Sequence, residues 1–335
     1  MSTSPRRFTA LLLAAAVVVA GACSDDEEEA AESPKQAFGE ALDAFGDYEG
    51  FTVVVSLNGD AAGLAPGEIS GEEAEAVENS SLTISAASDT SEGSQAEFTF
   101  NIDGNEDAVQ MRLVRQSLYA RVEVRDLVEA FGGDAAEVDT AVQQATAAGL
   151  EFAQPLADGE WIGVEGIDQL TQQFGLPQAT PDPEEASALV ERVAGVLEGN
   201  ARVTSEGTDD VGAHLLVAVP LKETARELLD TLQSFGGAAG ALPDTGLEEV
   251  PDGEIPIDVW ISDGRLVQLE LDFVAIAREL GEEPPEDVDE FALLMTIDEF
   301  TDGVEPPDDF VAIDLQEILQ GFFGTMVPEV ESPAG

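Results

Sequence analysis

The chain has 335 residues, of which 44% are hydrophobic, and it carries 70 Asp and Glu against 13 Lys and Arg, a net charge of −57. This hydrophobic content supports a sizeable core and argues against global disorder, while the negative field repels nucleic acid and anionic lipid surfaces. A single cysteine excludes an intrachain disulfide, and the composition alone does not separate an ordinary solvating surface from adaptation to high salt.

The N-terminal segment has the three parts of an export signal. Two arginines precede an uncharged run from Phe8 to Ala22. This run is too short to span a membrane, which takes about 20 residues. The run ends in the sequence AGAC, which matches a lipobox with Ala20 where Leu is usual. We predict a lipoprotein signal peptide at 1–22 and diacylglycerol on the sulfur of Cys23. The alternative is a secretory signal cut at an A-x-A site, with an incidental cysteine.

Residues 23–33 are acidic and alanine-rich, which is typical of a tether without a hydrophobic anchor. Two acyl chains on one residue give stable membrane attachment, because each buried methylene contributes about 0.8 kcal/mol. We therefore predict an extracytoplasmic protein that is lipid-anchored to the cell membrane through Cys23.

The folded part begins with a helix and continues mostly as strands. Ser33 and Pro34 form a helix start, and apolar residues recur at helical spacing as far as Gly46. Apolar and polar residues then alternate with a period of two, which is typical of an antiparallel sheet with one dry and one wet face. The strands predicted in this half cover 51–57, 81–86, 96–102, 108–114, 116–124 and 158–166.

A helical middle precedes a second series of strands. The predicted helices cover 125–131, 135–147, 167–174 and 184–197, and the further strands cover 200–207, 212–220, 255–262, 265–274 and 291–300. In the fourth of these strands, Val267, Leu269, Leu271 and Phe273 are predicted to share one face. Asp263-Gly264 is a strong two-residue hairpin signal. These elements give about eleven strands, with a loop at 237–253.

Residues that carry chemistry are few. His214, the only histidine, lies in an alternating strand and is typical of a structural or surface histidine. "DGNEDA" has Ala108 where a calcium loop needs its glycine, so it predicts a hairpin turn. Trp161 and Trp260 are assigned to sheet packing rather than to sugar stacking. We predict no catalytic residue, no metal site and no cofactor, and hence not an enzyme.

Four phrases resemble the actinobacterial LppX/LprG lipoproteins of the LolA/LolB-like superfamily. They are "QSLYARVEV", "ADGEWIGVE", "DVWISDGRLVQLEL" and "MTIDEFTDGVEPPDDF". The resemblance implies an α+β fold, a single unclosed antiparallel β-barrel with helices that cover its concave face and a hydrophobic cavity between them. It also implies a hydrophobic or acylated ligand that is carried within the cell envelope, with an envelope transporter as a further partner. We assign this half-barrel domain to 34–326 and a disordered tail to 327–335.

The family supplies no invariant binding residue, so candidates for the cavity wall come from the strand faces. They are Phe98, Phe100, Met111, Leu113, Leu269, Leu271 and Met295. The alternative is that these side chains form a solid core.

Two functions from different classes follow. The first is a binding protein for a lipid or other amphiphile, and the alternative is a non-enzymatic scaffold, sensor or chaperone that uses the half-barrel for a protein partner. A cavity of several hundred Å³ favours the first, and a filled core with an exposed apolar patch favours the second. A hydrolase would require convergent polar groups in a cleft.

Overall fold

The structure is a computed structural model, and it divides the chain into two compact units. The first unit comprises Met1–Glu49, Asn58–Gly63 and Gly175–Glu299, and the second comprises Gly50–Leu57, Leu64–Phe174 and Phe300–Gly335. The structure describes residues 33–46, 48–59, 71–89, 93–165, 192, 195–235, 252–281, 288 and 291–313.

All twelve strands of the described residues belong to one sheet, in the order β12-β6-β5-β4-β3-β2-β1-β11-β10-β9-β8-β7. Every pairing within the two units is antiparallel except that of β12 with β6. The bounds are β1 Gly50–Gly59, β2 Ser81–Asp89, β3 Gly93–Ile102, β4 Asn105–Val114, β5 Ser117–Val122, β6 Ile162–Val164, β7 Arg202–Thr208, β8 Ala213–Pro220, β9 Glu254–Ser262, β10 Arg265–Asp272, β11 Phe291–Glu299 and β12 Val311–Ala312. The predicted α+β class with one open, mostly antiparallel sheet is confirmed. The predicted strand series lacked β12.

The helices agree with the sequence patterns in part. The helices described in full are α2 Pro34–Gly46, α3 Gly71–Glu78, α4 Val124–Ala130, α5 Ala135–Ala147, α6 Ala153–Ala157, α9 Leu221–Phe235 and α10 Phe273–Glu279, and residues 195–200 are also helical. Helices α2 and α5 have the predicted bounds, and α4 starts and ends one residue earlier than predicted. The patterns did not predict α3, α6, α9 or α10. The predicted helix at 167–174 and most of the one at 184–197 lie outside the described residues.

Helix α10 corrects the prediction that a strand continues to residue 274. The carboxylate of Asp272 accepts hydrogen bonds from the backbone N–H groups of Val274 and Ala275, at 2.8 and 3.1 Å. An aspartate that caps two free N–H groups starts a helix at the next residue. Phe273 is therefore the first residue of α10 and does not share the face of β10.

Tight turns join the hairpins. Asp263 and Gly264 both have positive φ, 52° and 72°, as a type I′ turn requires. Asp103 and Gly104 repeat this backbone between β3 and β4. Both predicted hairpins are confirmed, including the one drawn from "DGNEDA".

In the first unit, α2 packs against β10 and β7 and brings Phe38 and Leu42 into the core. The pairing of β10 with β9 shifts between Leu266 and Gln268, so Val267 is the extra residue of a bulge. Leu266 then pairs with Ile261 and is 2% exposed. The face predicted for Val267 is therefore taken by Leu266, because one extra residue inverts the alternation.

Strand β7 is the last strand in the order, and most of its side chains are exposed. Its pairing with β8 shifts between Ser205 and Gly207. A bulge at a sheet edge interrupts the regular row of backbone groups.

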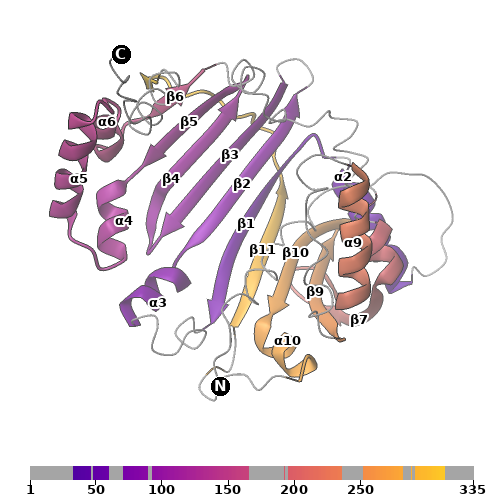
Figure 1. Cartoon of the computed structure of the whole chain (residues 1–335). Helices are drawn as coiled ribbons and strands as arrows, with labels where there is room; N and C mark the ends of the chain where they lie inside the picture. The colour runs from indigo at the N-terminus through magenta and orange to yellow at the C-terminus, as the bar shows by residue number, and fades with distance from the viewer. Residues whose placement is uncertain are drawn as a thin grey trace, which may run out of the picture. The chain divides into compact units, whose positions relative to one another are not determined.

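In the second unit, the chain after β11 lies across one side of the sheet. Val304 and the partly buried Phe310 pack with Val114 and Tyr119 in one cluster. The backbone N–H of Val304 donates to Oε1 of the buried Gln95 at 2.8 Å. Figure 1 shows α4, α5 and α6 gathered at one side of β4 and β5, which α4 and α6 contact. Within the described part of the chain, no helix is long and apolar enough to span a membrane.

Candidate functional site

One face of β1 to β6 in the second unit carries three paired rows of apolar side chains, and we call these rows the apolar face. Its middle row follows the strand register from Ile84 through Phe98, Met111 and Ala120 to Ile162. Two flanking rows complete the face: Val55, Leu82, Phe100, Val109 and Val122 on one side, and Phe51, Ala86, Ala96, Leu113, Leu118 and Val164 on the other. Since neighbouring strands lie about 4.8 Å apart, six strands span roughly 24 Å.

The apolar face is incompletely covered. Phe98, Met111 and Leu118 are 37%, 38% and 37% exposed, and most of the other members are partly exposed. A large contiguous apolar patch on a soluble domain marks a binding surface more often than it marks ordinary surface. The centre of this face is therefore a candidate binding site.

The opposite face of the same strands is polar and is the better covered of the two. Gln95 and Gln110 are each 7% exposed, and Arg112 lies over the ring of Trp161, 4.8 Å from its centroid. This arrangement differs from the simple expectation that the apolar face of the strands is the dry one. The polar face is covered because the segment after β11 packs Val304 and Phe310 against it.

Three of the four arginines among the described residues of the second unit have acidic partners. Arg112 donates to Glu97 at 2.6 Å, and Arg121 pairs with Glu123. Arg125 contacts Asp139 of α5 and Asp158, which follows α6, and these hydrogen bonds raise its pKa above the ordinary value. Arg115, the remaining arginine among the described residues of this unit, is not without a partner either. A ligand at the apolar face would therefore find few cations ready to bind it.

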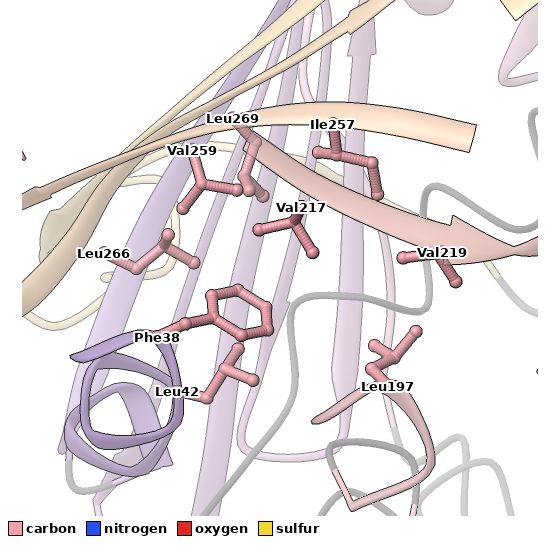
Figure 2. Close-up of a pocket in the computed structure, with 9 residues that line it drawn as sticks. All are labelled: Phe38, Leu42, Leu197, Val217, Val219, Ile257, Val259, Leu266 and Leu269. Carbon is pink, nitrogen blue, oxygen red and sulfur yellow. The ribbon is translucent and has the colours of Figure 1, made fainter. Parts of the chain in front are cut away.

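The first unit contains an apolar pocket of a different kind. Figure 2 shows Phe38 and Leu42 of α2 directed toward side chains of the strands. The cavity volume is about 20 Å³, which holds about one water molecule. The complete lining is Phe38, Leu42, Leu197, Val217, Val219, Ile257, Val259, Leu266 and Leu269. This pocket, which described residues line, is too small for an acyl chain. It belongs to the packed core of the first unit.

The seven residues predicted for the cavity wall are divided between the two units. Phe98, Phe100, Met111 and Leu113 lie together on the apolar face. The other three lie in the first unit: Leu269, Leu271 and Met295, all buried. Leu269 lines the small pocket described above. Cys23, residues 1–22 and the tail 327–335 lie outside the described residues.

The sequence reasoning missed Leu118, which is as exposed as Phe98 and lies on the same face. Its alternation with Tyr119 gave the signal, because Leu118 has the parity of Ala120. Leu266 was missed for another reason, since a bulge leaves no mark in hydrophobic alternation.

The single histidine contacts an aromatic ring and a carboxylate within the first unit. The ring of His214 stacks on Trp260 with centroids 4.5 Å apart, and its Nε2 lies 2.7 Å from Oδ1 of Asp258. Trp260 donates in turn to Asp209 at 2.7 Å. This hydrogen bond, together with backbone N–H groups of the turn, lowers the pKa of Asp209. The described residues contain no group of three or more His, Cys, Asp or Glu arranged to hold a metal ion.

No family model matches the sequence, and the search of curated proteins found no match. Among solved structures, the chain is similar to the crystal structure of the Mycobacterium tuberculosis lipoprotein LppX. The alignment has 12% identity and a TM-score of 0.33, and it covers 81% of this chain and 97% of that one. At this similarity, the assignment of the fold depends on the strand pairing described above.

Proposed function

We propose that the protein is a lipid-anchored, extracytoplasmic binding protein that holds the acyl part of an amphiphile against the apolar face. The observation that carries the proposal is the contiguous exposure of Phe98, Met111 and Leu118. An acyl chain bound to this face would remove its own surface and that of the face from water. Each Å² of apolar surface buried in this way stabilises the complex by about 25 cal/mol.

The chemistry of the face favours an acyl chain over a protein partner. Protein interfaces are enriched in Tyr, Trp, Phe, Met and Arg, so Phe and Met alone do not separate the two partners, but protein interfaces also carry about one hydrogen bond per 100–200 Å². The three rows of the apolar face contain only aliphatic residues, Phe and Met. Such a surface offers no side-chain hydrogen bond, and an alkyl chain needs none.

A protein partner is the second candidate, and one observation favours it. The pocket among the described residues of the first unit measures about 20 Å³, whereas ligand pockets measure about 300–1,000 Å³. A filled core in one unit and an exposed apolar patch in the other together form the combination that was expected for a scaffold or chaperone. The two candidates share the surface, so the experiment must distinguish the occupant.

Native mass spectrometry of the protein purified from its own membranes tests the occupant directly. We expect a co-purifying acylated molecule, released on denaturation. In parallel, a fluorescent monoacylglycerol should bind at least about tenfold more weakly to a Phe98→Ser, Met111→Ser double variant, because two large apolar contacts are lost.

The matched controls are Phe131→Ser and Val211→Ser. Both residues are exposed apolar residues, 47% and 42%, and neither belongs to the apolar face. Their substitution should leave binding of the monoacylglycerol unchanged. Equal binding by the double variant and the unsubstituted protein, or no bound lipid and no probe binding at all, would reject the proposal.

A further inference from the structure

We infer that the amphiphile held at the apolar face has an uncharged or cationic head group, and that an anionic head group is selected against. The inference rests on the proposed function and narrows its ligand class. It follows from the charges around the face rather than from the face itself.

The first argument is the availability of cations. An anionic head group needs a positive partner when it is drawn toward an apolar, low-dielectric surface. Arg112 and Arg121 lie on the opposite, polar face of the strands, where each is paired with a glutamate. Arg125 is shared between Asp139 and Asp158. An anion at the apolar face could bind one of these three arginines only by disrupting an existing ion pair.

The second argument is the acidic rim. Four exposed carboxylates lie at the end of the face where β3 turns into β4 and β5 leads into α4. They are Asp103, Glu106, Asp126 and Glu129. An anion placed at this end would meet several like charges with little compensation.

The third argument is the field of the whole chain. With a net charge of −57, the protein repels anions over a range set by the Debye length, about 30 Å at 10 mM salt. Repulsion of this kind slows the approach of an anion and weakens its binding, and salt removes both effects. A neutral head group experiences neither.

Three probes with the same acyl chain test the inference: monolaurin, laurate and lauroylcholine, each below its micelle-forming concentration. The protein is the full chain with Cys23→Ser, and binding is measured by calorimetry at pH 8. At about 10 mM salt, lauroylcholine and monolaurin should bind at least about fivefold more tightly than laurate. At about 1 M salt, the three affinities should converge.

A charge-reversal variant tests the local part of the argument. Glu106→Lys with Glu129→Lys should raise the affinity for laurate about two- to fivefold at low salt. The affinity for monolaurin should stay the same in this variant, which controls for a change in the face itself.

The failures of the two proposals are distinguishable. If no probe binds, the proposed function fails. If laurate binds as tightly as monolaurin at low salt, the head-group selection fails and the function stands. A gap between laurate and monolaurin that is equally wide at high salt would also overturn the electrostatic selection.

Discussion

The turn between β4 and β5 places two ordinary side chains in the left-handed backbone region. Arg115 and Gln116 have φ of 50° and 69°, whereas the β3–β4 and β9–β10 hairpins use Asp-Gly for the same geometry. A residue with a Cβ pays roughly 1–2 kcal/mol in this region, and glycine does not.

Replacing Gln116 with Gly should therefore raise the free energy of unfolding by about 0.5–1 kcal/mol, since the gain in backbone freedom of the unfolded chain offsets part of the relief. Urea denaturation measures the change. Gly264→Gln is the matched control and should lower the free energy of unfolding by about 1 kcal/mol. Nothing lies within 4 Å of a Cβ built at Gly264, so the cost is the backbone's alone. A loss of stability in Gln116→Gly would contradict this account.

A second residue-scale prediction concerns Asp209 and its hydrogen bond from Trp260. Its lowered pKa means that the carboxylate stabilises the fold above the ordinary value of 3.8 and that this contribution is lost as the pH falls through the lower, folded value. Carboxyl NMR should find the pKa of Asp209 below 3.8. Trp260→Phe should move it upward, although the bonds from Val211 and Gly212 remain.

Trp161→Phe is the control for this titration, because Trp161 packs in the second unit. The pKa of Asp209 should not move in that variant. A pKa of Asp209 that stays the same in Trp260→Phe would assign its lowering to the turn alone.

At the scale of the elements, β4 and β10 have the same alternation of apolar and polar residues, but their apolar side chains have different surroundings. Leu269 of β10 is 2% exposed in the packed core of the first unit, whereas Met111 of β4 is 38% exposed on the apolar face. Sequence alternation marks both as facing the apolar side. Only the packing around each strand separates a core residue from a surface residue.

Substitution by alanine should distinguish the core residue Leu269 from the surface residue Met111. Leu269→Ala should lower the free energy of unfolding by about 2–5 kcal/mol, because it leaves a cavity in a packed core. Met111→Ala should cost less than about 1 kcal/mol and should instead weaken binding of a monoacylglycerol. Chemical denaturation measures the two changes in the free energy of unfolding, and a titration with the monoacylglycerol measures the change in binding. Equal destabilisation by the two substitutions would place Met111 in a core and remove it from the site.

The elements also show where local sequence signals suffice. Asp263-Gly264 and Asp103-Gly104 predicted their hairpins because their residue types fit the required φ. The predicted bounds of α5 are observed, and its N-cap Asp134 accepts from Ala136 as a capping aspartate should. The bulge at Val267 left no such signal, because the sequence reads as unbroken alternation there.

At the scale of the whole molecule, the open antiparallel sheet was predictable, and the exposure of its apolar face was not. The period of two fixes which side chains share a face. Which face is covered depends on long-range contacts, such as that between Gln95 and Val304, separated by 209 residues. The candidates Phe98 and Met111 were therefore found as face residues, whereas their exposure came from the structure.

The proposed membrane attachment is also a property of the whole chain. Cys23→Ala should leave the protein uncleaved or release it into the medium, because no sulfur remains to accept diacylglycerol. Metabolic labelling with palmitate should fall to background in this variant. Ser24→Ala is the neighbouring control and should keep its label. Labelling that survives Cys23→Ala would refute the anchor.

The irregular edge at β7 limits how the protein can self-associate. A long, flat edge strand recruits strands from other chains and seeds aggregates, whereas a bulged, polar one does not. β7 has exposed polar side chains and a register shift at Gly207. Among the described strands, β7 therefore offers another chain no long, regular edge on which to add a strand.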